Sequence, residues 1–264
     1  MAKKRVLLGM SGGIDSSVAA ILLLKQGYDV VGLTMKMWDN IENDPRHKHN
    51  GSHATDSILE AKAVAHKLNI QHYTENIVDE FNQTVICNFI NEYLDGKTPN
   101  PCVLCNTKTK WNVLLRKAKA LNCDFIATGH YAQIIKTNSK YTLKQARDQK
   151  KDQSYFLWGL TQEILKKALL PLGKFTKDEI RGIAAEKGFL KLAQKKESQE
   201  ICFIPDNDYR RYLKDNVPEI SQKIGPLTFT AFCEAIPLIG GKQTGQTINT
   251  SAARIRITGI VQQS

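Results

Sequence analysis

The chain has 264 residues, of which 42% are hydrophobic, and carries a formal net charge of +11 with a pI near 9.3. This length allows one large or two small domains with a buried core, and the absence of a run of about 18 apolar residues excludes a membrane-spanning helix. The positive charge indicates a polyanionic partner, with nucleic acid as the first candidate. Because the N-terminus enters a strand at once, we expect no signal peptide, a cytoplasmic location and reduced cysteines.

The first predicted elements surround a glycine turn. The apolar run 6–9 predicts a buried strand, and the Ala-rich run 18–24 predicts a helix that ends at Gly27. Between them, residues 11–17 read Ser-Gly-Gly-Ile-Asp-Ser-Ser. Strand, glycine turn and helix N-terminus together are typical of a phosphate site, because free N–H groups and the helix dipole converge on an anion. The alternative is an ordinary strand–turn–helix junction capped by Ser and Asp.

The turn also excludes two better-known nucleotide motifs. It lacks Gly-Lys-Ser/Thr, so it is not a Walker loop, and it lacks Gly-x-Gly-x-x-Gly, so a dinucleotide fold is not indicated. A second strand over 29–37 completes a parallel βαβ unit with the first. Its continuation, 38–54, carries His47, His49 and His53, which we interpret as part of a solvated loop, because no Cys or carboxylate completes a metal site.

The middle of the chain continues the α/β alternation. Periodicity predicts helices over 55–68 and 78–94, with a strand at 71–76 between them, and Cys87 is expected to pack inside the second helix. The segment 97–106 holds two prolines and no periodicity, so we expect a loop. A helix over 107–121 and a strand over 125–128 follow.

Gly129 and His130 come directly after that last strand. Sites in open α/β sheets lie beyond the carboxyl ends of the strands, so both residues are expected beside the first glycine turn. A rim hairpin is predicted over 131–145. Helices are predicted over 161–170 and 176–187, the latter opened by the capping box of Thr176 and Glu179.

Three cysteines suggest chemistry. Cys102 and Cys105 form a C-x-x-C pair, and Cys202 follows about 100 residues later. Structural zinc wants four ligands, and no second C-x-x-C exists. Three cysteines suffice for a [4Fe–4S] cluster with one open iron, whereas a redox or sulfur-carrying role needs only two thiols that meet. Cys123 and Cys233 are interpreted as structural.

Six segments appear in an order that resembles one known family. They are the 11–17 turn, Met35, the 98–106 stretch Thr-Pro-Asn-Pro-Cys-Val-Leu-Cys-Asn, Thr-Gly-His-Tyr at 128–131, Lys-Asp-Gln-Ser-Tyr-Phe-Leu at 151–157 and Ile-Cys-Phe-Ile at 201–204. Over residues 1–225 or so, the chain closely resembles the bacterial tRNA-specific 2-thiouridylases. The resemblance implies an α/β fold with the parallel sheet of the adenine-nucleotide α-hydrolase (pyrophosphate-loop, Rossmann-like) type, followed by a small, mainly helical region.

The resemblance also implies residue roles. It assigns ATP binding, with Mg²⁺, to Gly9, Met10, Ser11, Gly12, Gly13, Ile14, Asp15, Ser16, Met35 and Gly129. It assigns contacts with tRNA or its target base to Asn100, Pro101, Cys102, His130, Lys151, Asp152 and Gln153. Cys202 would carry a persulfide, Cys105 would be its thiol partner, and a Cys105–Cys202 disulfide would close the cycle. The partners implied are a tRNA with a wobble uridine and a protein that donates persulfide sulfur.

Two departures from the family pattern are visible. Many members carry Asp where this chain has Cys102, which keeps the [4Fe–4S] alternative on Cys102, Cys105 and Cys202 open. The second departure is the tail, because we expect residues 214–264 to be anomalous and to lack the family's C-terminal barrel.

Before this tail we expect an ATP pyrophosphatase domain with the rim hairpin over 1–145 and a helical extension with the second catalytic cysteine over 146–213. Alternative functions are another pyrophosphate-loop ligase or amidotransferase, and a catalytically impaired paralogue that binds ATP or tRNA.

Overall fold

The computed structural model describes residues 3–38, 54–194, 201–204, 206 and 208–217, with the backbone of two short strands at 248–250 and 253–255. The predicted histidine loop at 47–53 lies outside the described residues. Contacts divide the chain into two compact units, one of Met1–Thr84 with Cys102–Gln199 and one of Val85–Pro101 with Glu200–Ser264. The domain boundaries expected from the sequence stay a prediction.

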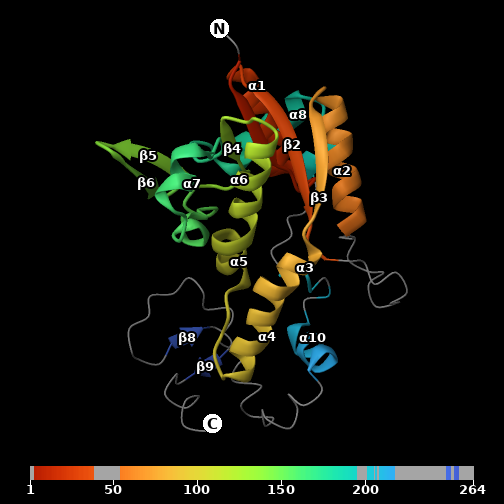
Figure 1. The fold of residues 1–264 in the computed structure, drawn as a ribbon, viewed down its shortest axis with the longest axis vertical. Coiled ribbons are helices and arrows are strands. Elements are labelled where there is room, and N and C mark those ends of the chain that lie inside the picture. Colours follow the sequence, from red (N-terminus) through yellow and green to blue (C-terminus); the bar gives the residue numbers. More distant parts are fainter. Residues whose placement is uncertain are drawn as a thin grey trace. The chain divides into compact units, whose positions relative to one another are not determined.

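A five-stranded parallel sheet organises the first unit (Figure 1). Its strands follow the order β3 (Gln71–Asn76), β2 (Asp29–Lys36), β1 (Arg5–Gly9), β4 (Phe125–Ala127) and β7 (Ala168–Leu169). Every neighbouring pair is parallel. All carboxyl ends therefore meet at one edge, and the glycine turn after β1 lies between the ends of β2 and β4. The α/β fold class predicted from the sequence is confirmed.

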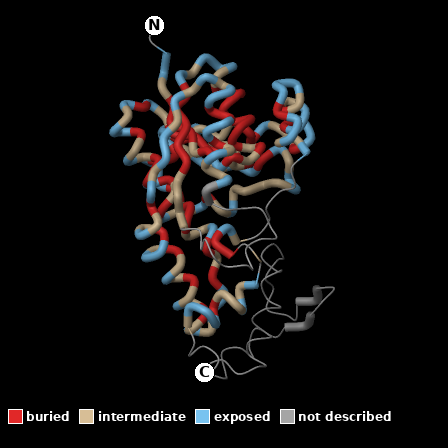
Figure 2. The backbone as a smooth tube through the Cα atoms, turned by 90° about the vertical axis from the view of Figure 1, so that its right-hand side faces the viewer, coloured by how far each residue is buried: buried red, intermediate tan, exposed pale blue. Residues whose placement is uncertain are grey.

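Helices cover both faces of this sheet. On one face, α1 (Ile14–Lys25), α2 (Ala54–Lys67) and α8 (Lys177–Glu186) share a buried cluster with Leu8 of β1. On the other, α6 (Trp111–Ala120) and α7 (Gln162–Lys167) pack with Leu7. Successive strand residues point to opposite faces, so a strand covered on both sides is apolar throughout. Figure 2 shows the resulting concentration of buried backbone at the sheet.

The rim hairpin is confirmed as β5 (Gln133–Thr137) and β6 (Lys140–Lys144), which pair antiparallel. The predicted helix over 161–170 is wrong at its end, because α7 stops at Lys167 and the next two residues form β7. A two-residue strand is too short to show an alternating pattern in the sequence. The short helices η4 (Ser154–Leu157) and α9 (Leu190–Gln194) also belong to this unit.

The expected loop at 97–106 is confirmed for 97–100 and is wrong from Pro101 on. α5 (Pro101–Leu104) runs into the π-helical turn η3 (Cys105–Lys110), which continues as α6. Proline is favoured in the first turn of a helix, where its missing N–H costs nothing, so Pro101 opens the helix here. Cys102 and Cys105, three residues apart, consequently lie on a helix, on neighbouring positions of one face.

The second unit holds an aromatic cluster. The helix α3 (Val78–Phe81) still belongs to the first unit, and η2 (Asn82–Ile86) crosses the boundary after Thr84 and leads into α4 (Cys87–Leu94). The other described helix of the second unit is α10 (Tyr209–Asn216). Phe89 contacts Tyr93, Phe203 and Tyr212 edge-on, with ring centroids 4.9, 5.4 and 6.2 Å away. Cys87 is exposed, contrary to the packing role expected for it. The strands β8 (Ile248–Thr250) and β9 (Ala253–Ile255) pair antiparallel.

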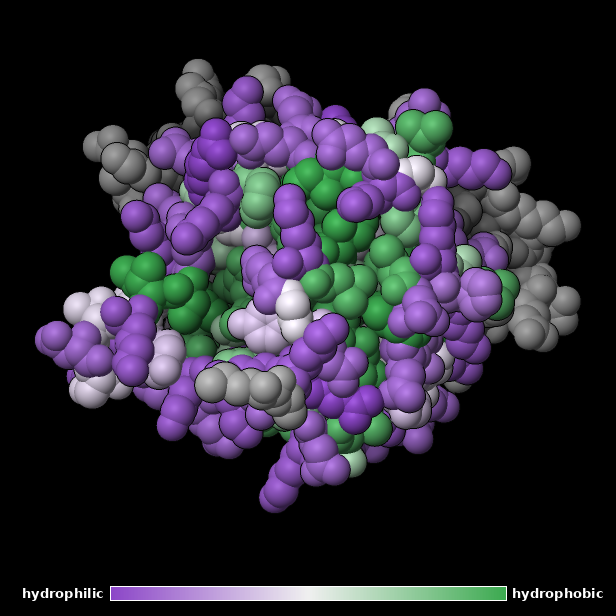
Figure 3. All heavy atoms as spheres, turned by 90° about the horizontal axis from the view of Figure 1, so that it is seen from above, coloured by the Kyte–Doolittle hydropathy of each residue, from purple (hydrophilic) through white to green (hydrophobic). Residues whose placement is uncertain are grey.

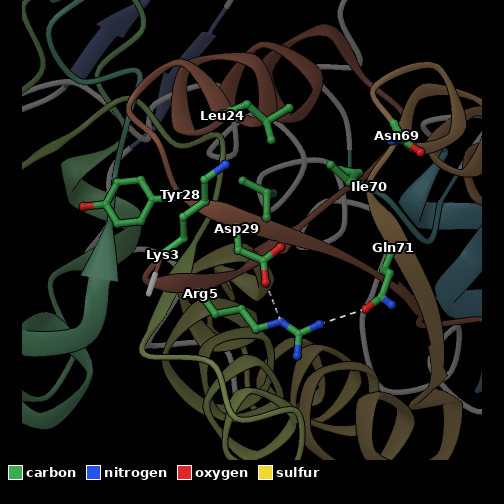
Figure 4. A pocket seen from close by; sticks show the side chains of 9 residues that line it. Lys3, Arg5, Leu24, Tyr28, Asp29, Asn69, Ile70 and Gln71 are labelled. Atoms are coloured by element: carbon green, nitrogen blue, oxygen red, sulfur yellow. Dashed lines mark hydrogen bonds and ion pairs between the residues drawn. The ribbon is translucent and has the colours of Figure 1, made fainter. Parts of the chain in front are cut away.

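The amino edge of the sheet carries a pocket of about 550 Å³. Arg5 spans it, pairing with Asp29 at 3.1 Å and donating to Gln71 Oε1 at 2.8 Å (Figure 4). Figure 3 views the protein from above relative to Figure 1, and it shows mostly hydrophilic side chains around apolar residues near the centre of the view. The pocket around Arg5 lies at the amino edge of the sheet, opposite the carboxyl edge that carries the glycine turn. No helix within the described ranges has the length and apolarity needed to cross a membrane.

Candidate functional site

The turn after β1 leaves the N-terminus of α1 open to a ligand. Gly13 is its N-cap residue, and no side chain caps it. The first N–H groups of a helix have no partner within the helix, so those of α1 are available to an anion. Gly12 has a φ of +73°, and a Cβ there would lie 2.7 Å from Ser57 O of α2. Only glycine therefore fits this turn without strain.

Hydroxyl groups fix the turn from within. Ser16 Oγ accepts from Ser11 N and donates to Gly13 O, both at 3.2 Å. Ser17 Oγ donates to the same Gly13 carbonyl at 2.8 Å. Gly13 O also accepts from Ser17 N at 3.2 Å, so this carbonyl points into α1 and the groups left at the open end of the turn are N–H donors. Gly9, Met10 and Ile14 flank the turn, and the last two are buried.

Gly129 touches the turn from the neighbouring strand end, as the sequence predicted. A Cβ at Gly129 would lie 2.8 Å from both Asp15 C and Ser16 N. Its φ lies outside the left-handed region, so the close approach is what requires glycine here. Residues 9–16 and 129 therefore form one surface, built from the ends of β1 and β4.

Asp15 is held by residues that sequence reasoning missed. Lys177 Nζ donates to both of its carboxylate oxygens, at 2.8 and 2.9 Å, and Tyr131 Oη donates to Oδ1 at 2.7 Å. Lys177 comes from the first turn of α8, after the confirmed capping box of Thr176 and Glu179. No local pattern in the sequence distinguishes this lysine from the others.

Cys105 is buried and Cys102 is exposed on the same helix. Burial raises the pKa of the Cys105 thiol, and desolvation by the surrounding protein also raises that of Cys102, although much of this residue's surface is exposed. The Lys110 ammonium acts in the opposite direction on each thiol. A backbone hydrogen bond from Lys110 further favours the Cys105 thiolate. Lys110 is thus the cation that partly offsets the desolvation of the two thiols, and no local pattern in the sequence distinguishes it from the other lysines.

His130 connects the helix of the thiols to the strand end of Gly129. Its ring stacks on Trp111 with centroids 6.3 Å apart, and its Nδ1 lies 2.7 Å from Thr128 Oγ1. Burial, with a smaller contribution from Lys110, lowers the pKa of His130 to about 3. The imidazole is therefore neutral near pH 7, and it offers a neutral donor or acceptor rather than a charge.

The remaining predicted residues are placed as follows. Met35 lies half-buried at the carboxyl end of β2. Asp152 accepts from Ala146 N and Ser154 Oγ, and Gln153 exchanges hydrogen bonds with the backbone of Tyr131. These two side chains shape the loop that carries Lys151. Asn100 and Pro101 belong to the second unit, as does Cys202, which is exposed.

One buried polar atom next to the thiols has no partner. Asn106 is 4% exposed, and its Nδ2 donates to Cys102 O at 3.0 Å. Its Oδ1 accepts no hydrogen bond in the described part of the chain. An unpaired buried acceptor is costly, so a ligand donor is a natural complement for it. Among the described residues, no group of three or more His, Cys, Asp or Glu side chains is arranged to hold a metal ion.

The fold and the turn define an α/β nucleotide-binding domain of the pyrophosphate-loop class. Residues 4–206 match the family described as tRNA methyl transferase HUP domain, and the chain belongs to this family. It is 55% identical over 224 residues to the tRNA-specific 2-thiouridylase MnmA of Amoebophilus asiaticus, covering 85% of this chain and 60% of that protein.

A second curated relative bears the same name. The tRNA-specific 2-thiouridylase MnmA of Cytophaga hutchinsonii is 52% identical over 225 residues, which cover 85% of this chain and 61% of that protein. The chain therefore spans about three fifths of the length of these curated relatives. A solved NMN synthetase from Francisella tularensis is 15% identical, with a TM-score of 0.44 over 94% of this chain and 90% of that one.

Proposed function

We propose that the protein transfers sulfur to C2 of the wobble uridine of tRNA in a reaction driven by ATP. The main observation behind the proposal is that, in the first unit, two adjacent residues link the glycine turn to the helix that carries a thiol. Gly129 packs on the open N-terminus of α1, and the next residue, His130, stacks on the helix that bears Cys105. The similarity to the 2-thiouridylases supports the same conclusion.

ATP would bind with its phosphates at the glycine turn, where free N–H groups meet the positive end of α1. The uridine O2 attacks the α-phosphorus, pyrophosphate leaves, and O2 becomes part of an AMP leaving group. C2 of uracil is a poor electrophile before this step and a reactive one after it. Mg²⁺ would neutralise the phosphates of the bound nucleotide.

Sulfur would arrive as a persulfide on Cys202, supplied by a donor protein. The terminal sulfur attacks C2, and AMP leaves with the oxygen. The Cys105 thiolate then attacks the Cys202 sulfur, so a Cys105–Cys202 disulfide forms and the thiocarbonyl is released. The two electrons that reduce the transferred sulfur come from these two thiols, and an external thiol reductant restores them.

The surroundings of Cys105 suit this chemistry. Burial shields the thiol from stray oxidants and raises its pKa, and Lys110 opposes part of that rise. The unpaired Oδ1 of Asn106 complements the N3–H donor of a uracil ring. The target base must leave its stack to reach such a site. The charge of +11 supplies attraction for the RNA backbone.

The test is nucleoside mass spectrometry after incubation of the protein with ATP, a persulfide donor and unmodified tRNA. We expect 2-thiouridine from the wild type and from Cys87→Ser, whose thiol is exposed and has no assigned role. Cys105→Ser and Cys202→Ser are expected to give none. Release of pyrophosphate without thiolation would favour another pyrophosphate-loop ligase, and ATP binding with no turnover would favour an impaired paralogue. Iron analysis of anaerobically purified protein tests the cluster alternative.

A further inference from the structure

The ion pair between Lys177 and Asp15 is unusual for its place in the fold. The Lys177 side chain is 7% exposed and the Asp15 side chain is 33% exposed. Taking an ammonium group out of water is costly unless a partner compensates it. The Asp15 carboxylate does so with both oxygens, within 2.9 Å. Lys177 Nζ also lies 5.7 Å from the centre of the Tyr131 ring, which favours a cation there.

Asp15 poses an electrostatic problem for the glycine turn. It lies in the first turn of α1, where a carboxylate interacts well with the helix dipole. The same position puts a negative charge beside the N–H groups that would receive a polyphosphate. Like charges this close disfavour binding unless a cation offsets one of them.

We propose that Lys177 is a positioning residue of the nucleotide site, which neutralises and orients Asp15 so that the turn stays attractive to phosphate. This inference rests on the proposed function. The start of α8 positions Lys177. Its backbone N–H donates to Asp148 Oδ2 at 2.9 Å, and the capping box fixes the preceding residue, Thr176. Tyr131 Oη holds the same carboxylate from the β4 side.

The experiment is isothermal titration calorimetry with MgATP and with adenosine, on the wild type and the variants K177M, K177R and D15N/K177M. We expect K177M to raise the Kd for MgATP about tenfold, or ~1.4 kcal/mol. Its Kd for adenosine should not change, because adenosine carries no phosphate charge. K177R should lie between the wild type and K177M. D15N/K177M should recover to within about threefold of the wild type, since no carboxylate is left uncompensated.

Three outcomes would overturn the inference. An unchanged Kd of K177M for MgATP would mean that the ion pair is only structural. Equal losses for MgATP and adenosine would point to a distorted fold. Persistent loss in D15N/K177M would show that Lys177 acts on the phosphates directly. If K177M does not fold, the double variant still decides, because it leaves no charge unpaired. Failure of the wild type to bind ATP would refute the proposed function itself.

Discussion

Replacement of Gly129 by alanine tests whether the end of β4 is part of the nucleotide site. A Cβ there would lie 2.8 Å from Asp15 C and Ser16 N, and 3.1 Å from Asp15 O. Ordinary contacts between such atoms are about 3.5–4.0 Å, so one backbone must move by roughly 1 Å. All three atoms belong to the backbone, which cannot rotate away as a side chain can.

The expected cost follows from this geometry. Overpacking of this kind costs about 1–3 kcal/mol, against a gain of about 0.4–1 kcal/mol from the less flexible unfolded chain. In a protein of this size, we expect a fall in Tm of roughly 2–8 °C. A displacement of about 1 Å at the turn misaligns an N–H donor with the phosphates. Loss of one hydrogen bond to a charged group costs about 1.5–3 kcal/mol, so the Kd for MgATP is expected to rise ~10- to 100-fold.

The assay combines thermal unfolding with calorimetric titration of MgATP. Gly182→Ala is the matched control, because it lies in α8 with nothing within 4 Å of a built Cβ. It should leave MgATP binding unchanged and stabilise the protein by up to about 1 kcal/mol. The reasoning is refuted if Gly129→Ala binds MgATP as tightly as Gly182→Ala does.

Two further predictions concern the thiol side of the site. Lys110→Met, compared with Lys110→Arg in a Cys102→Ser background, is expected to raise the pKa of Cys105 and slow its alkylation by iodoacetamide at pH 7; equal rates would contradict this role. His130 is neutral when folded, with its pKa lowered from 6.5 to about 3, so it weakens stability as pH falls through that window. Melting curves of His130→Gln should show a smaller loss between pH 7 and 4 than the wild type.

Much of the fold followed from local pattern. The run 6–9 is apolar because β1 is covered on both faces, and the glycines at 12 and 13 mark the turn that follows it. The placement of Gly129 beside the turn followed from the rule that parallel strands share a carboxyl edge. These features depend on residues close in sequence or on general topology, which a sequence displays.

The parts that sequence missed depend on tertiary context. Prolines at 99 and 101 suggested a loop, but one of them opens the helix that carries the thiols. β7 is held by its pairing with β4 and has no pattern of its own. Lys177 contacts a carboxylate 162 positions away, and the effect of Lys110 on Cys105 depends on how the helix is folded. No sequence motif around either lysine indicates its role.

The bond between Asp15 and Lys177 spans 162 positions of the chain. During synthesis the glycine turn emerges first and its compensating lysine emerges far later, after β4 and β7 have been made. Contacts this distant in sequence form slowly, because a long loop must close before they contribute. The nascent chain therefore has the glycine turn well before α8 supplies the lysine that compensates Asp15, and the proposed nucleotide site is completed late in the synthesis of this unit.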